Sequence, residues 1–427
     1  MTGPVIDLGE LRHGSDPDPL PRPPRANGRS LRCALALLLV LVTVGAAAAP
    51  PPRRSVVTLP VRPGADVLID GDLLLGIEPI NDTRTLQRRL AAYRLPSGAP
   101  VWQASLPGEA RYWGIAPVAG MLLVTGYEIG VDSQSSLTVA LDRATGAYRW
   151  QQPGSATLLA DGSLLLQAGG EGQPVSLRAV DACCGNVRWQ LPAAANVEVQ
   201  HSGRGAARVV LHQRNGPTEV RDAATGSVLA RADLRPPGGE PLDFVQVIND
   251  LLVTIGGEPT TVTGYGLDRL DRRWTSTRGR VEFSADCGPV LCLRTGANEL
   301  QAIDIATGEL RWRSDRWRWG WPFEGRLMVS ASDGGAVEHY LVLDALTGRQ
   351  LADLGQWSLF QLGVGGRLVG VRRHPDSGML VGELDIRAGK VRILDVLPEA
   401  VGNCQAIVDH LLCTTPNGSY QLWTLPD

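Results

Sequence analysis

The feature of this sequence that most restricts its fold is a short strand, turn, strand unit that recurs along the chain. The clearest copy is AIDIATGELRW, which ends at Trp312. In it, Asp304 can accept hydrogen bonds from turn amides, and Gly308 can supply the positive φ that closes the turn. The other copies are ALDRATGAYRW ending at Trp150, AVDACCGNVRW ending at Trp189, AYRLPSGAPVW ending at Trp102, VRDAATGSVLA, VLDALTGRQLA, GLDRLDRRW and ELDIRAGKVRI.

Each copy follows a second hairpin with a Gly, Asn or Asp turn, such as VLIDGDLLLG from Val67 and INDLLVTIGG from Ile248. Apolar residues crowd the second strand of these hairpins, which is typical of strands buried on both faces. Two hairpins give four strands per unit of roughly 40 residues, the spacing of four-stranded propeller blades. The sequence therefore predicts an all-β chain with a single β-propeller, although 427 residues alone would suggest two or three domains.

The ends of the chain predict how the ring closes. About nine inner hairpins are present but only eight complete outer hairpins, because SYQLWTLPD lacks a return strand. Pairing Val56 to Leu59 with Tyr420 to Leu425 would supply that strand and remove exposed edges. We therefore expect eight or nine blades closed by N- and C-terminal strands. One irregular stretch is expected not to form a blade of its own: either Ala195 to Ala230 or the long first unit.

Before the propeller, the sequence predicts one transmembrane helix. Residues 1–30 are rich in Pro, Gly and charge, as in a disordered cytoplasmic tail, and residues 31–49 form an apolar run near the short end of bilayer-spanning length. Arginines precede this run in excess, which places the propeller, residues 56–427, on the extracytoplasmic side after a linker at 50–55. The alternative is a cleaved signal peptide with small residues at Ala46 to Ala49. Cys33 precedes the apolar core, unlike a lipoprotein cysteine.

The recurring Asp, Thr-Gly and Trp of these copies resemble the repeat of the pyrroloquinoline-quinone-like (PQQ-like) propellers. That family includes quinoprotein alcohol dehydrogenases and a non-catalytic outer-membrane assembly scaffold. The resemblance covers nearly all of 56–427 and implies that four tryptophans dock between adjacent blades: Trp102, Trp150, Trp189 and Trp312. Their place one strand after a turn also suits large rings that fill the space between twisted sheets.

Two cysteine pairs suit cross-strand disulfides. Cys287 and Cys292 flank a Gly-Pro turn, and Cys404 and Cys413 flank the equivalent turn near the C-terminus. An exported domain is where such bonds persist, and buried free thiols are the alternative.

Cys183 and Cys184 are adjacent and replace the usual Ala-Thr of the outer turn. We interpret the pair as a structural vicinal disulfide; the resemblance adds a cofactor role as an alternative, since in quinoprotein dehydrogenases a vicinal disulfide packs on the quinone. Here the pair lies between outer strands, away from a cofactor on the ring axis. Free or intermolecular thiols are the other alternative.

The sequence otherwise gives no catalytic constellation. The histidines are scattered, and there is no phosphate loop, HExxH or nucleophile elbow. Turn structure accounts for the prominent aspartates, namely Asp142, Asp181, Asp222, Asp304, Asp344 and Asp385. The long insertions of the quinoprotein enzymes are also missing, so we expect no cofactor and no metal. A formal net charge of -3 gives no reason to propose nucleic acid as a partner.

One segment suggests a binding surface. RWRSDRWRWGWPF predicts Trp317, Trp319 and Trp321 on one face of an extended segment, with Arg316 and Arg318 on the other. Tryptophan and arginine are common anchors of protein interfaces. The alternative is that these rings fill a junction between two blades.

Together these features predict a monomeric, single-pass cell-membrane protein, not an enzyme, whose propeller binds another cell-envelope protein. The other classes considered are an exported quinone-dependent oxidoreductase and a carbohydrate-binding or sensor module.

Overall fold

The computed structural model describes residues 33–39, 56–61, 65–79, 88–107, 110–128, 136–169, 175–194, 196–213, 216–235, 241–296, 298–331, 337–361, 367–374, 378–407 and 410–425. Two compact units are present, Met1–Arg54 and Ser55–Asp427. In the first unit, residues 33–39 are helical. No helix among the described residues has both the length and the apolar character to cross a membrane. The rest of the predicted anchor, 31–49, the tail and the linker before residue 56 lie outside the described residues.

The second unit consists of antiparallel sheets in which successive strands are neighbours. Four of the four-stranded sheets are β2 (Asp66–Asp70), β3 (Leu73–Pro79), β4 (Arg88–Arg94) and β5 (Ala99–Leu106); β6 (Ala110–Val118), β7 (Met121–Glu128), β8 (Ser136–Asp142) and β9 (Tyr148–Pro153); β10 (Ser155–Leu158), β11 (Leu164–Ala168), β12 (Val175–Val180) and β13 (Val187–Ala194); and β14 (Asn196–Ser202), β15 (Gly205–His212), β16 (Thr218–Asp222) and β17 (Val228–Ala232). Two more are β18 (Leu242–Ile248), β19 (Leu251–Gly256), β20 (Thr261–Gly266) and β21 (Arg272–Thr277); and β22 (Val281–Asp286), β23 (Val290–Thr295), β24 (Leu300–Asp304) and β25 (Leu310–Ser314).

Two sheets depart from this pattern. A seven-stranded sheet contains β26 (Trp319–Phe323), β27 (Arg326–Ser330), β28 (Glu338–Leu343), β29 (Gln350–Gln361), β30 (Leu368–Arg373), β31 (Met379–Asp385) and β32 (Lys390–Leu397). The closing sheet contains β33 (Gly402–Ile407), β34 (His410–Thr414), β35 (Tyr420–Thr424) and β1 (Val56–Leu59).

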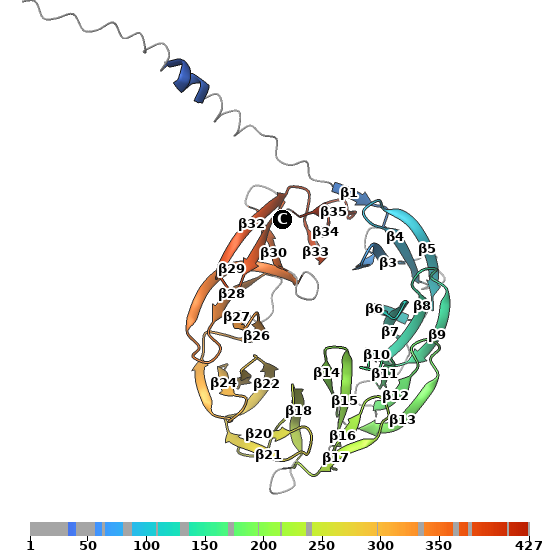
Figure 1. Ribbon diagram of the computed structural model, residues 1–427, viewed down its shortest axis with the longest axis vertical. Coiled ribbons are helices and arrows are strands. Elements are labelled where there is room, and N and C mark those ends of the chain that lie inside the picture. Colours follow the sequence, from blue (N-terminus) through green and yellow to red (C-terminus); the bar gives the residue numbers. More distant parts are fainter. Residues whose placement is uncertain are drawn as a thin grey trace, which may run out of the picture. The chain divides into compact units, whose positions relative to one another are not determined.

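The closing sheet joins the two ends of the second unit. Val56 to Leu59 of β1 pair with Trp423 to Tyr420 of β35, close to the register that the sequence predicts. The Tyr420 hydroxyl donates to Ala65 O at 2.6 Å, which ties this sheet to the one that begins with β2. In Figure 1 the sheets follow one another around a ring, with β6, β10, β14, β18, β22, β26 and β33 on the inner side. The chain therefore forms a β-propeller.

The stretches expected to be irregular form complete sheets. Residues of the stretch 195–230 make β14 to β17, and the long first unit makes β2 to β5. That part of the prediction was wrong, because the longer connections leave the pairing of the flanking strands intact.

The hydrophobic core lies between consecutive sheets. Leu74 and Leu75 of β3 are adjacent and both fully buried, but they belong to two different clusters. Leu75 packs with Val124 of β7, whereas Leu74 packs with Leu412 of β34. Each sheet thus buries both faces against its neighbours, and every such side chain contributes about 1.5–3 kcal/mol. This explains the apolar runs in the second strands.

Candidate functional site

The four tryptophans assigned to blade docking occupy one repeated position. Each follows the first residue of the preceding outer turn by the same spacing, as in 142 and 150 or 304 and 312. Each indole Nε1 donates to a carbonyl oxygen in the outer turn of the next sheet: Trp102 to Arg143 at 3.0 Å, Trp150 to Ala182 at 2.8 Å, Trp189 to Ala224 at 3.1 Å and Trp312 to Ala345 at 2.8 Å.

The glycine of each outer turn provides the surface on which the ring lies. Gly146 has φ +70°, and a Cβ built on it would lie 2.3 Å from Cε3 of Trp102. Real Cβ atoms do not approach carbon this closely, so the turn needs glycine both for its conformation and for the contact. The Trp of one sheet therefore packs directly on the turn Gly of the next sheet.

Trp274 makes the same contact, although the sequence analysis did not assign it to docking. Its Nε1 donates to Ile305 O at 3.0 Å, and its ring covers Gly308. The available signal was its place at the end of the weak copy GLDRLDRRW. That copy departs from the pattern because Leu270, with φ 54°, takes the position of the turn glycine.

The repeated aspartates hold the outer turns. Asp142 Oδ1 accepts the amide of Thr145 at 3.0 Å, and its Oδ2 accepts Arg149 at 2.7 Å. Asp304 accepts the amides of Ala306 and Thr307 and pairs with Arg311 in the same way. These carboxylates are satisfied within their own hairpins.

The turn carboxylates predict a loss of stability in acid. Hydrogen bonding from the Arg149 side chain, and then from Thr145, lowers the pKa of Asp142 to about 2. Because the pKa in the folded state is below the unfolded value of about 4, the ionised group stabilises the fold above about pH 4 and loses that effect as pH falls towards 2. We expect the melting temperature to fall over this interval, and less steeply in Asp142→Asn. An identical pH profile for wild type and variant would contradict this prediction.

Both hairpin cysteine pairs are disulfides in the structure. Cys287 and Cys292 are joined at an S–S distance of 2.04 Å, and Cys404 and Cys413 at 2.09 Å. The first disulfide lies against the next sheet, where Gly320 leaves room for it. These bonds tie the first two strands of their sheets.

Cys183 and Cys184 are free, exposed thiols in the structure, so the vicinal disulfide is a correction to the sequence interpretation. The turn keeps the backbone pattern of its sister copies, with the Gly185 amide bonded to Asp181 O at 2.9 Å. A hydrogen bond between the two thiols raises the pKa of Cys183. The pair lies at an outer turn, away from the inner strands.

The three tryptophans predicted to share one face lie in different environments. Trp317 precedes β26 and is 6 % exposed in the cluster around the Cys287–Cys292 disulfide. Trp321 packs edge-on against Tyr340 at 5.7 Å. The single row expected from period-two alternation was therefore wrong, because the segment becomes a strand only at Trp319. Arg318 donates to Asn298 O at 3.4 Å.

Trp319 instead meets Phe283, and Phe244 stands near the start of the preceding inner strand; we call these three residues the aromatic row. Phe244 lies near the start of β18, Phe283 near the start of β22, and Trp319 begins β26. The rings of Phe283 and Trp319 meet edge-on at 4.8 Å. Phe244 is 43 % and Phe283 38 % exposed, and Trp319 is half-buried. The sequence analysis missed the two phenylalanines, whose only signal was an apolar residue at the same point of two inner strands.

Charged side chains flank the aromatic row. The Arg294 guanidinium lies 4.8 Å from the centre of the Trp319 ring and 3.6 Å from the carboxylate of Glu282. Asp243 and Glu282 are exposed and immediately precede the two phenylalanines. Each occupies a bulge, where the pairing with the next strand skips one residue. The row is therefore an apolar strip bordered by acidic groups.

A second exposed aromatic faces the junction of the closing sheet. Trp113 is 63 % exposed at a bulge in β6. It lines a cleft of about 660 Å³ together with Arg111, Asn403 and Tyr420.

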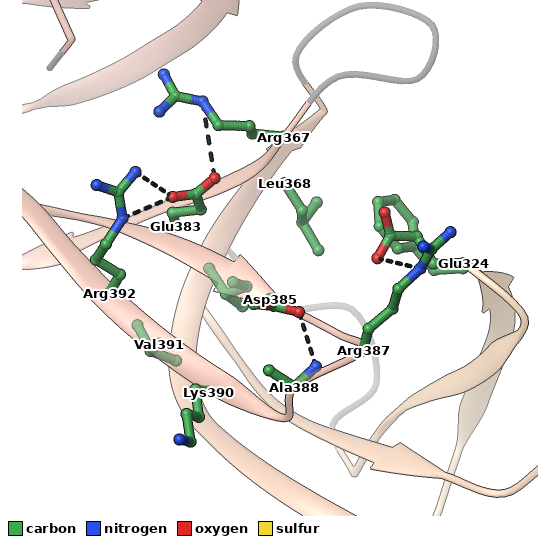
Figure 2. A pocket seen from close by; sticks show the side chains of 12 residues that line it. Glu324, Arg367, Leu368, Glu383, Asp385, Arg387, Ala388, Lys390, Val391 and Arg392 are labelled. Atoms are coloured by element: carbon green, nitrogen blue, oxygen red, sulfur yellow. Dashed lines mark hydrogen bonds and ion pairs between the residues drawn. The ribbon is translucent and has the colours of Figure 1, made fainter. Parts of the chain in front are cut away.

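Another cleft, of about 640 Å³, lies beside the turn that joins β31 and β32 (Figure 2). Glu383 accepts a hydrogen bond from Arg392 at 2.6 Å and forms an ion pair with Arg367 at 3.7 Å, and Arg387 lies 3.6 Å from Glu324. Lys390 points away from these pairs. Most of the charge that lines this cleft is internally compensated.

The buried titratable groups of the described ranges are structural. Glu78 is 1 % exposed and contacts Arg89 at 2.6 Å and the Tyr93 hydroxyl at 3.0 Å. His212 is bonded through Nδ1 to Thr218, and burial lowers its pKa. No group of three potential metal ligands occurs among the described residues.

The comparisons with known proteins agree with the repeat and the fold. A PQQ-like repeat model, described as outer membrane protein assembly factor BamB, matches residues 87–267. Residues 87–267 of the propeller therefore carry PQQ-like repeats. This part includes the docking residues Trp102, Trp150 and Trp189. No curated protein matches the chain.

Solved structures resemble the PQQ-like propeller only distantly. BamB from Moraxella catarrhalis is 12% identical, with a TM-score of 0.44 over 87% of this chain and 96% of that one. A europium-containing methanol dehydrogenase is 13% identical, with a TM-score of 0.41 over 86% and 83%. The computationally designed Ika8 protein is 16% identical, with a TM-score of 0.45 over 74% and 96%. At these values the superpositions carry no argument about function.

Proposed function

We propose that this propeller is a binding module for another protein of the cell envelope, with the aromatic row as its central contact. The observation that carries this proposal is the exposure of Phe283, whose ring meets Trp319, together with the exposure of Phe244 near the start of the preceding inner strand. Other side chains of this size, such as Trp150 and Trp357, fill the spaces between the sheets. Rigid aromatic side chains grouped at one place are the usual anchors of protein interfaces.

The charged side chains around the aromatic row indicate which charges the partner carries. Asp243 and Glu282 present carboxylates beside the rings, while Arg294 is engaged with both Trp319 and Glu282. A segment with apolar side chains flanked by Lys or Arg would bury the rings and complement these acids. Such acidic flanks would mainly accelerate association, whereas the rings would supply most of the affinity.

Anchoring at the membrane is part of the proposal. The apolar run at 31–49 and the arginines before it support a signal anchor with the propeller on the extracytoplasmic side. The two disulfides suit an oxidising compartment. The match to an outer membrane assembly factor model is consistent with an envelope location. No observation favours the quinone-dependent oxidoreductase, so we do not propose it.

We further infer that the ring has nine blades. β29 pairs with β28 through its first part, up to Trp357, and with β30 from Ser358 onward. Such a strand serves as the outermost strand of one blade and the innermost strand of the next. Dividing the seven-stranded sheet there gives two four-stranded blades beside the closing sheet and the six other sheets.

Photo-crosslinking in intact cells tests the binding proposal. A photoreactive residue in place of Phe283 is expected to give one discrete adduct with an envelope protein. The matched control is Tyr148, which is 60 % exposed on an outermost strand and lies outside the aromatic row. The adduct should be lost when Phe244→Ser is added. The absence of an adduct at Phe283, or the same adduct from Tyr148, would argue against this surface.

A further inference from the structure

The junction between the β14–β17 and β18–β21 sheets lacks the docking tryptophan. Ala230 stands at the tryptophan position, and Leu270 replaces the turn glycine of the next sheet. Leu270 is 5 % exposed and packs with Ala230 in the cluster between the two sheets. The small residue thus stands at the Trp position and the larger one at the Gly position. A leucine fills less of the junction than an indole does.

A cleft of about 600 Å³ opens at this junction. Its floor is the face of the β18–β21 sheet that carries Thr254, Thr263 and Thr275. These three residues are direct cross-strand neighbours on β19, β20 and β21. Hydroxyl groups therefore form a line across the sheet.

At the junction where Trp102 docks, the positions equivalent to Thr254 and Thr263 are apolar. In the β6–β9 sheet, Val124 and Val139 pair at the equivalent point of the second and third strands, and both are fully buried. Thr254 and Thr263 are 3 % and 7 % exposed. The second-strand position is a leucine in three other sheets, at Leu166, Leu211 and Leu293, so the threonine hydroxyl at this position is a departure from the repeat.

The threonines that line the cleft have hydrogen-bond partners within the protein but keep further hydrogen-bonding capacity. Thr263 and Thr275 share one hydrogen bond at 3.3 Å, and Thr261 donates to Gly256 O at 3.0 Å. A hydroxyl offers one donor and two acceptor sites, so each keeps acceptor capacity. The half-buried ring of Tyr265, with Leu242 beside it, adds apolar surface.

The charges at the cleft do not select an ion. Arg235 is held by Asp233 in a two-point contact, at 2.5 Å and 2.9 Å. The remaining charged side chains, Arg272 and Glu258, have opposite signs. A neutral ligand suits this balance better than phosphate or a carboxylate.

We propose that this threonine cleft (Thr254, Thr261, Thr263 and Thr275) binds a neutral saccharide. Sugar hydroxyls match a row of protein hydroxyls, and the apolar face of a sugar ring matches a tyrosine ring. The volume lies within the range of small-molecule sites and suits a short oligosaccharide. This site is separate from the aromatic row and does not depend on the proposed protein partner.

Titration of the full-length protein with maltose, cellobiose, N,N′-diacetylchitobiose and inorganic phosphate tests the proposal. We expect at least one disaccharide to bind with millimolar affinity or better, measured by calorimetry and saturation-transfer NMR. Thr254→Val combined with Thr263→Val should weaken that binding by about tenfold. Ser276→Ala, on the opposite face of β21, should leave it unchanged.

Other outcomes would overturn the proposal. These are no binding by any disaccharide, preferential binding of phosphate, or undiminished binding by the double valine variant. A thermal unfolding profile establishes that the variant folds. If it does not fold, Thr275→Val, at an exposed position, provides the same comparison, with a loss of about threefold expected.

Discussion

Trp150→Ala is expected to lower the free energy of unfolding by about 3–5 kcal/mol, the usual cost of removing a buried tryptophan. Trp150 is 6 % exposed, and its indole donates to Ala182 O at 2.8 Å. Removing the ring opens a cavity between two sheets and leaves a turn carbonyl without its donor. Urea unfolding followed by fluorescence, with the slope m compared between proteins, measures the change.

The matched control for this variant is Trp113→Ala. Trp113 is 63 % exposed, so its removal should change stability by no more than about 0.5 kcal/mol. Equal losses from the two variants would contradict the assignment of Trp150 to docking.

Gly146→Ala is expected to destabilise the propeller by about 1–3 kcal/mol more than Gly162→Ala does. Both glycines have positive φ, +70° and +84°, so the two alanines carry similar backbone strain. They differ in their surroundings. A Cβ at Gly146 meets the Trp102 ring at 2.3 Å, whereas one at Gly162 has no neighbour within 4 Å. The difference between the two variants therefore isolates the contact between sheets.

Thermal unfolding of both glycine variants in the same buffer checks this prediction. Equal melting temperatures would mean that Gly146 is needed only for its turn conformation. A larger drop for Gly162→Ala would contradict the account outright.

Repetition made most of the fold predictable from the sequence. A strand pattern that recurs with the same Asp, Gly and Trp fixes the hairpins, and the ends of the chain indicate how β1 pairs with β35. The sequence did not predict the structure of the segments that depart from the repeat. β29 continues without a turn from one four-stranded array into the next, and this depends on how the neighbouring sheets pack.

The candidate site was less predictable, because exposure is a tertiary property. Trp317 and Trp319 look alike in sequence, yet one is buried beside a disulfide and the other joins Phe283. Phe244 and Phe283 carry no local signal until the inner strands lie side by side. Trp274 was missed because Gly266 and Leu270 stand where most copies have Asp and Gly, although its ring makes the same contact as its sister residues.

The account separates residues that hold the ring from residues that bind a partner, and one measurement tests this most directly. The affinity of the cross-linked partner is measured for full-length protein carrying Phe244→Ser and Phe283→Ser, with thermal unfolding recorded in parallel. The account predicts an unchanged melting temperature and a loss of affinity of about 30-fold or more, as for interface anchors worth about 2 kcal/mol. Full affinity in the folded double variant would contradict it.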